Sequence, residues 1–216
     1  MRHFHTRSDT DDIEVVRNVW ERHEYVHPGY EITPGQVVVD VGAHIGAFAV
    51  WAADKGAHVT AYEPDSRNYH VLQQNIAEWG VDVTAVQKAV AKNAGVHKFW
   101  PNALPTMGSL TRVAGDHIDV ECVTLADIVG DGCDLLKLDA EGAEYEIIVE
   151  GDAETLRRIE RIMLEWHDSR DWADILIWRL SNAGFVIDRY MHEMLRMESP
   201  NRFNVRGKVY ARRGAL

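Results

Sequence analysis

The chain has 216 residues, with 23 lysines and arginines against 34 aspartates and glutamates, so its formal charge is 23 − 34 = −11 at pH 7. This length suits one domain with a substantial core, and the acidic balance opposes general attraction to a nucleic-acid backbone. Residues 1–9 lack the apolar run of a signal peptide, and no run in the sequence approaches transmembrane length. Cys122 and Cys133 lie in apolar runs typical of buried free thiols, so we expect a cytoplasmic protein that does not bind a membrane.

Apolar residues at helical spacing predict a first helix over residues 11–23, followed by an aromatic-rich turn at 25–30. We expect residues 1–34 to form a helical cap segment that packs on a main domain of residues 35–216. The cap segment is placed to cover the sheet or to contribute to a pocket.

From residue 37 onward, β-branched apolar runs alternate with amphipathic stretches, a pattern typical of parallel strands joined by helices. The expected strands are residues 37–41, 58–62, 83–88, 118–123, 133–138, 161–165, 184–189 and 207–212. The expected helices are residues 45–54, 67–79, 124–129, 142–149 and 170–183. The last two strands follow one another directly and should be antiparallel. The sequence therefore predicts an α/β fold: a mostly parallel sheet, helices on both faces, and an antiparallel hairpin at one edge.

One long irregular segment, residues 99–110, contains two prolines and several apolar residues. Long irregular segments inside compact domains are often lids or binding loops. A surface loop without function is the alternative.

The strand at residues 37–41 leads into the sequence Asp40-Val-Gly-Ala-His-Ile-Gly46 at the start of a helix. Gly42 and Gly46 permit a tight turn and a close approach of the backbone to a ligand, which the free N–H groups of the helix would face. Glu63 ends the next strand and is placed to accept hydrogen bonds from ribose hydroxyls. This pattern predicts a nucleoside cofactor, although a glycine turn that binds nothing is the alternative.

The residues around the glycine turn distinguish two nucleoside cofactors. A dinucleotide usually needs the pattern G-x-G-x-x-G to place its pyrophosphate on the helix N-terminus, and that pattern is absent here. A carboxylate at Asp40 would repel pyrophosphate but attract the ammonium of a methionine moiety. The sequence therefore favours S-adenosylmethionine over NAD.

Charged residues also follow two later strands, in the sequences Lys137-Leu-Asp-Ala-Glu-Gly-Ala-Glu144 and Leu164-Glu-Trp-His167. Ligands of open α/β sheets bind at the carboxyl ends of the strands. If these two strands are neighbours, Asp139, Glu165 and His167 converge on the crevice that Asp40 faces.

With these motifs, residues 35–168 closely resemble the FkbM-type S-adenosylmethionine-dependent methyltransferases. The matching segments, in order, are Asp40-Val-Gly-Ala-His-Ile-Gly46, Tyr62-Glu-Pro-Asp65, Asn75, Lys88-Ala-Val-Ala91, Val123-Thr-Leu125, Lys137-Leu-Asp-Ala-Glu-Gly-Ala-Glu144 and Leu164-Glu-Trp-His167. The resemblance implies the seven-stranded class I methyltransferase fold and, usually, methylation of a hydroxyl on a sugar or natural product.

The resemblance also implies site residues. It places Ala89 and Val90 near the adenine, beside Asp40, Gly42, Gly46 and Glu63 as cofactor-binding residues. His44 stands where the family commonly has asparagine, so this departure could alter cofactor affinity or replace one hydrogen-bonding side chain with another. Ala140 replaces a β-branched residue, which we interpret as a packing change.

Methyl transfer from a sulfonium is an in-line displacement, so the protein must align the acceptor with the methyl group and help to remove its proton. Asp139 is the first candidate for the proton acceptor and His167 the second, because imidazole titrates near neutrality. Asp139 could instead cap the following helix, and His167 could be a surface histidine. Glu141 and Glu144 could simply favour a helix dipole, and Lys137 could pair with a carboxylate inside the sheet.

Asp139, Glu165 and His167 also offer oxygen and nitrogen ligands that could hold Mg²⁺ and lower the acceptor's pKa. The sequence shows no tight ligand spacing that requires a metal, so this variant stays a hypothesis.

The expected partner is a small-molecule or glycan acceptor. An RNA 2′-O-methyltransferase is an alternative, because Lys137, Asp139 and Glu165 resemble part of a lysine-aspartate-lysine-glutamate constellation. The missing second lysine and the net charge oppose it, and we interpret the basic residues near the C-terminus as solvated hairpin ends. Those residues are Arg202, Arg206, Lys208, Arg212 and Arg213. A binding module that keeps the cofactor fold without chemistry is a third possibility.

Overall fold

The computed structural model describes residues 3–101, 109–110, 116–167, 170–196 and 203–214. The strands are β1 (Val37–Val41), β2 (His58–Tyr62), β3 (Val83–Val86), β4 (Ala89–Val90), β5 (Gly95–Phe99), β6 (Ile118–Val123), β7 (Leu135–Leu138), β8 (Arg161–His167), β9 (Phe185–Arg196) and β10 (Phe203–Arg213). The helices are α1 (Asp12–Trp20), α2 (Ala47–Asp54), α3 (Ser66–Trp79), α4 (Leu125–Val129), α5 (Glu144–Ile148), α6 (Ala153–Leu156) and α7 (Arg170–Asn182).

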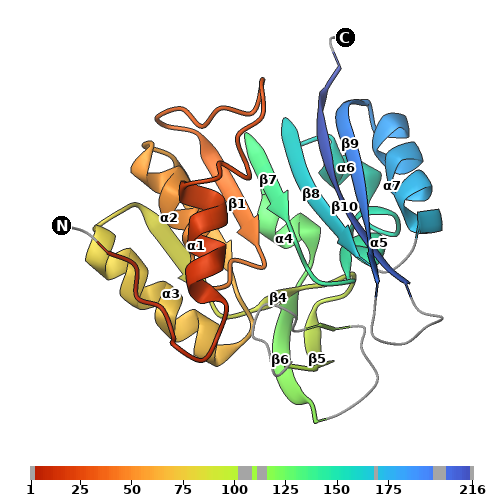
Figure 1. Ribbon diagram of the computed structural model, residues 1–216. Helices are drawn as coiled ribbons and strands as arrows, with labels where there is room; N and C mark the ends of the chain where they lie inside the picture. Colours follow the sequence, from red (N-terminus) through yellow and green to blue (C-terminus); the bar gives the residue numbers. More distant parts are fainter. Residues whose placement is uncertain (1–2, 102–108, 111–115, 168–169, 197–202, 215–216) are drawn as a thin grey trace.

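Seven strands form the main sheet in the order β3-β2-β1-β7-β8-β10-β9 (Figure 1). The first five of these are parallel to one another, and β10 pairs antiparallel with both β8 and β9. The predicted seven-stranded, mostly parallel sheet with an antiparallel hairpin edge is therefore confirmed. Strands β1 and β7 lie side by side, so their carboxyl ends meet at one edge of the sheet.

Both faces of the sheet are covered, which explains the continuous apolar runs of its central strands. Val38 and Leu135 belong to the core under α1, α2 and α3, whereas Val39 and Leu136 belong to the core under α4 to α7. Alternate side chains of a strand point to opposite faces, so one run supplies both cores. Figure 1 shows the two groups of helices on either side of the sheet.

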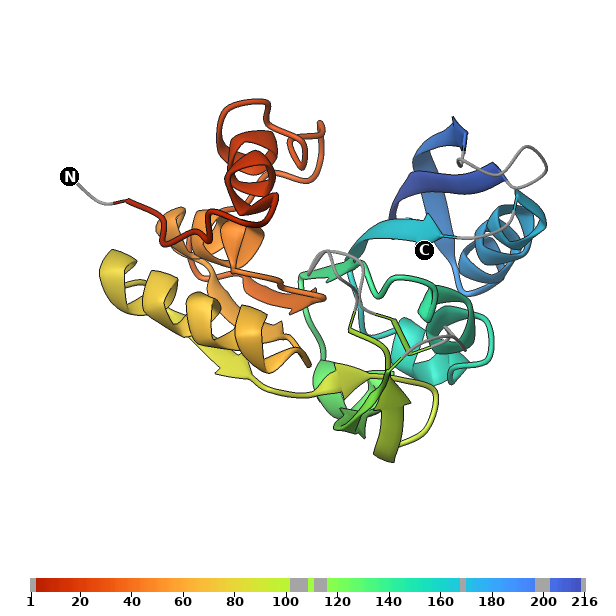
Figure 2. The same cartoon turned by 60° about the horizontal axis from the view of Figure 1, so that its bottom comes forward.

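A second, three-stranded sheet in the order β4-β6-β5 differs from the sequence prediction. The strand expected over residues 83–88 ends at Val86, and the chain then enters β4, which pairs with β6. This small sheet encloses its own apolar cluster, which includes Phe99 and Cys122. Strand periodicity gives no information about which sheet a strand joins, so the sequence could not separate the two sheets. Figure 2 shows the small sheet apart from the main one.

The helix expected over residues 142–149 begins later, at Glu144. Glu141 and Gly142 have φ angles of 50° and 106°, which lie outside the helical range and make a turn before α5. Of the loop expected at 99–110, residues 102–108 lie outside the described part of the chain. At its two ends, Trp100 and Ser109 exchange backbone hydrogen bonds of 2.9 and 3.1 Å.

The N-terminal segment packs on the main domain through α1, which lies against α2 (Figure 1). The indole Nε1 of Trp20 donates to the carbonyl oxygen of Ala47, and the Trp20 ring contacts those of Phe4 and Trp79. Cys122 and Cys133 are buried and free, as predicted. Among the described residues, no helix has both the length and the apolar character needed to cross a membrane.

Candidate active site

The turn after β1 brings three chain segments together. The backbone N–H groups of Gly42 and Ala43 donate to the carbonyl oxygen of Tyr62, each at 3.0 Å. A Cβ atom on Gly42 would lie 1.8 Å from the carbonyl oxygen of Asp139, and the residue has a φ of 73°. Only glycine fits this crossing of β1, β2 and β7, because any side chain would collide with backbone.

Glu63 holds the same turn from the end of β2. Its buried carboxylate accepts hydrogen bonds from the backbone N–H groups of His44 (2.8 Å) and Asp65 (2.9 Å) and from Nδ2 of Asn68 (3.3 Å). Burial raises the pKa of Glu63 to about 7, against the lowering effect of these donors. Asn68 was missed in the sequence, although its place one turn into the helix after Glu63 could have suggested the contact.

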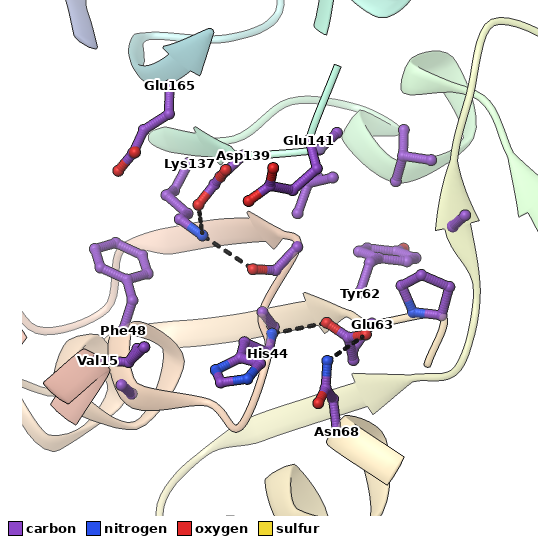
Figure 3. A pocket seen from close by; sticks show the side chains of 18 of the residues that line it. Val15, His44, Phe48, Tyr62, Glu63, Asn68, Lys137, Asp139, Glu141 and Glu165 are labelled. Carbon is purple, nitrogen blue, oxygen red and sulfur yellow. Dashed lines mark hydrogen bonds and ion pairs between the residues drawn. The ribbon is translucent and has the colours of Figure 1, made fainter. Parts of the chain in front are cut away.

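A cavity of about 360 Å³ opens at this edge of the sheet (Figure 3). Five of the seven predicted cofactor-binding residues line it: Gly42, His44, Glu63, Ala89 and Val90. The cap segment contributes to the wall as well, through residues that include Val15 and Tyr25. Phe99 and Leu110 from either end of the 99–110 segment complete it.

The other two predicted cofactor residues, Asp40 and Gly46, do not line this cavity. Asp40 is fully buried and points to the same face of the sheet as Val38, below the turn. Gly46 has a φ of 85° at the start of α2, where a Cβ would lie 2.4 Å from Cδ1 of Leu72. Their predicted contacts with the cofactor are thus not supported by the cavity lining and stay predictions.

Lys137 connects Asp40 to the cavity. Its buried Nζ lies 3.3 Å from the Asp40 carboxylate and 3.6 Å from that of Asp139, and it donates to the carbonyl oxygen of Gly42 at 3.1 Å. Burial raises the pKa of Asp40, and the ammonium of Lys137 opposes that shift. The expected pairing of Lys137 with a carboxylate inside the sheet is thus confirmed.

Asp139 forms the opposite wall of the cavity from Glu63 (Figure 3). Burial, followed by the nearby charge of Glu165, raises its pKa to about 6, although Lys137 and His167 oppose the shift. Its Oδ1 is buried and has no hydrogen-bond partner among the described residues. A carboxylate with a spare acceptor atom and a pKa just below neutrality is suited to take up a proton.

Asp139 does not cap α5. The N-cap position of that helix is Ala143, which makes no side-chain cap, and the Glu144 carboxylate accepts instead from the N–H groups of Ala140 (2.8 Å) and Gly142 (3.0 Å). Glu141 lies in the turn before the helix and lines the cavity, where burial raises its pKa to about 8. The helix-dipole interpretation of Glu141 was therefore wrong, since it precedes the helix.

His167 is neither a surface residue nor a free base. Its Nδ1 lies 3.1 Å from Glu144, and its Nε2 lies 3.9 Å from Asp139 and 3.8 Å from Glu141. Burial disfavours the charged ring, but the hydrogen bond to Glu144 and the three carboxylates outweigh burial and raise the pKa to about 10. The raised pKa favours the protonated ring, so these surroundings suit Asp139 better than His167 as the proton acceptor, and the role of His167 stays a prediction.

The set proposed for a metal is also corrected. The Glu165 carboxylate accepts from the hydroxyl of Tyr25 at 2.8 Å and lies 2.7 Å from Nζ of Lys208. In the described part of the chain, His167 instead forms a group with Asp139 and Glu144 whose possible ligand atoms all lie within 4.8 Å of one another.

The fold and site together define a class I methyltransferase. The structure resembles that of magnesium protoporphyrin IX methyltransferase from Synechocystis PCC 6803, solved with bound S-adenosylmethionine, with a TM-score of 0.56 and 16% identity over 98% of this chain and 86% of that one. At this identity the likeness concerns the fold.

The family follows from the sequence comparison: residues 40–196 match the model of the methyltransferase FkbM domain, and the chain belongs to this family. One relative is the 31-O-demethyl-FK506 methyltransferase FkbM of Streptomyces tacrolimicus, 27% identical over 80% of this chain and 81% of its own length. Another is methyltransferase sdnD of Sordaria araneosa, 29% identical over 70% of this chain and 74% of its own length. The resemblance seen in the sequence motifs is thereby confirmed.

Proposed function

We propose that the protein transfers a methyl group from S-adenosylmethionine to a hydroxyl of a small natural product, sugar or glycan. The observation that carries this proposal is Asp139, a carboxylate in the cavity wall with an unused acceptor atom and a pKa of about 6. Such a group can accept the hydrogen bond and then the proton of an attacking hydroxyl.

The residues of the cavity fit this cofactor. Its volume of about 360 Å³ lies within the usual range for ligand pockets. Glu63 would face the ribose hydroxyls, and the small apolar side chains of Ala89 and Val90 leave room for a flat base. When bound, the cofactor supplies an electrophilic methyl group on a sulfonium.

The other residues of the cavity wall favour the ionised form of Asp139 and restrict the access of the acceptor to it. Lys137 keeps the Asp139 carboxylate ionised more readily than burial alone would allow. The His167 ring, whose Nε2 lies 3.9 Å from Asp139, stabilises the same negative charge when it is protonated. Tyr25 and Glu165 form a hydrogen-bonded boundary of the cavity, which restricts where an acceptor can enter.

The relative from Streptomyces tacrolimicus supports oxygen as the acceptor atom, because its name specifies a 31-O-demethyl substrate. An RNA substrate is less well supported, since the formal charge is −11 and basic residues of the C-terminal hairpin are engaged. Lys208 pairs with Glu24 and Glu165, and Arg212 pairs with Asp188. The buried free cysteines fit a reducing compartment, so we also propose a cytoplasmic location.

The experiment is a transfer assay with S-adenosylmethionine labelled in its methyl group, over matched sets of sugars, polyhydroxylated natural products, amines and a structured RNA. We expect label in hydroxyl-bearing small molecules, with the methyl carbon bonded to oxygen in the product's NMR spectrum. Transfer only to amines or only to RNA would contradict the proposed substrate class.

The pH dependence of the reaction follows from the ionisation of Asp139. Because the ionised form must accept a proton, we expect kcat/KM for the acceptor to rise with pH through about 6 and to level off above it. Initial rates at saturating cofactor across this range test the expectation. A rate that does not fall on the acid side, in enzyme shown to stay folded there, would rule out Asp139 as the base.

A further inference from the structure

We infer that Arg7, which precedes α1, is a positioning residue for the methyl donor: it holds Asn68, and through Asn68 the carboxylate of Glu63. This inference rests on the proposed function, because it assigns Glu63 to the cofactor's ribose. It extends the cofactor site to a residue that lies in a different part of the chain from every motif described above.

The guanidinium of Arg7 is fixed in place by Asp12, the first residue of α1. Nε donates to Oδ2 and Nη2 donates to Oδ1 of the Asp12 carboxylate, each at 2.9 Å, and the backbone N–H of Arg7 donates to Oδ2 at 2.9 Å. The Asp12 side chain is fully buried and that of Arg7 is only 20% exposed. A bidentate ion pair of this kind holds the planar guanidinium in one orientation.

The same Nη2 atom reaches the cofactor turn. It donates to Oδ1 of Asn68 at 2.9 Å and lies 3.4 Å from Nε2 of His44. Because the oxygen of the Asn68 amide faces Arg7, its nitrogen faces Glu63 and donates to Oε1 at 3.3 Å. Arg7 therefore reinforces the amide orientation in which Asn68 donates to the Glu63 carboxylate, because a flipped amide would lose its hydrogen bond from Arg7 and turn its oxygen toward a second acceptor.

His44 is the second link. Burial lowers its pKa to about 4, with Asp12 opposing and Arg7 reinforcing the shift, so the ring is neutral at pH 7. In that state Nε2 can accept a hydrogen bond from Arg7, while the backbone N–H of His44 donates to Oε2 of Glu63. Arg7 thus contacts two of the residues that hold the Glu63 carboxylate, one at each oxygen.

The segment before Arg7 is anchored independently of the Arg7 side chain. The backbone of His5 exchanges two hydrogen bonds with the side chain of Asn75, and Nε1 of Trp79 donates to the carbonyl oxygen of His3. Removal of the Arg7 guanidinium should therefore leave residues 3–5 packed against α3. The substitution then removes only the side-chain contacts of Arg7 with Asp12, His44 and Asn68.

The test measures cofactor binding by calorimetry and steady-state kinetics in parallel. For Arg7→Met we expect the Kd and KM of S-adenosylmethionine to rise about 10-fold or more, with kcat within about 3-fold of the wild type. Asn68→Ala should show a similar rise, and the double variant little more than either single one, because both remove the same link. Arg7→Lys should recover part of the affinity.

Two further variants keep the test decisive. Arg7→Met combined with Asp12→Asn removes the buried carboxylate that Arg7 would leave unpaired, and this folded double variant should show the same loss of affinity. The control is Arg17→Met, because Arg17 is exposed and forms an ion pair with Glu14 on the same helix. Wild-type affinity in folded Arg7→Met would overturn the inference, whereas a wild type that binds no S-adenosylmethionine would overturn the proposed function itself.

Discussion

Replacement of Asp139 by asparagine is expected to lower kcat by about 10²- to 10³-fold while the Kd of S-adenosylmethionine changes less than about 3-fold. The amide keeps the shape of the side chain but cannot take the acceptor's proton. Single-turnover measurements with saturating cofactor separate this chemical step from product release. The variant should also lose the decline in rate below about pH 6.

The matched control is Asp134→Asn, which alters a carboxylate immediately before β7, at the opposite end of the strand from Asp139. Asp134 accepts from the backbone N–H of Val37 at 2.7 Å, and an asparagine oxygen can keep that bond. This control should retain kcat. If Asp139→Asn also retained it, the proton would have to leave by another route, and the assignment of the base would be wrong.

Replacement of Lys137 by methionine is expected to destabilise the fold by about 3–5 kcal/mol, because it leaves the buried charge of Asp40 without its partner. It also removes the hydrogen bond to the carbonyl oxygen of Gly42. Chemical denaturation, with the slope of the transition compared between variants, gives the change in the free energy of unfolding.

A second substitution and the pH distinguish the charge effect from lost packing. Adding Asp40→Asn to Lys137→Met should recover part of the stability, because it removes the unpaired charge. Without Lys137, the pKa of Asp40 rises further above its value in the unfolded chain, so the folded state binds the proton more tightly. The deficit of the single variant should therefore narrow as the pH falls. A deficit independent of pH and of Asp40→Asn would contradict this explanation.

That β1 and β7 are strands buried on both faces could be predicted, because their sequences are short and mostly apolar. The hairpin of β9 and β10 followed from the absence of a helix between them. The small sheet could not be foreseen, because only Gln87 and Lys88 separate β3 from Ala89 and Val90, although the chain leaves the main sheet at Val86. The spacing of apolar residues along a strand reflects which side chains are buried, and it contains no information about which strand lies beside it.

The same limit applies to the site. Gly42 and Glu63 could be identified because their roles follow from a local turn and from the end of a strand. Tyr25 lies 140 positions from the Glu165 that it contacts, and Arg7 lies 61 positions from Asn68. Contacts between residues so far apart in the sequence cannot be inferred from the spacing of residues within a motif. The pKa of His167 depends on three carboxylates that meet only in the folded chain, so the sequence could not show that its surroundings favour the protonated ring.

The central claim is that this cavity binds a methyl donor with Glu63 at its ribose, and calorimetric titration of the protein tests it most directly. We predict one site per chain for S-adenosylmethionine and for S-adenosylhomocysteine, no binding of NAD, and an affinity at least about 10-fold weaker for both ligands in Glu63→Gln. Binding of NAD in preference to either ligand, or undiminished affinity in Glu63→Gln, would contradict the account.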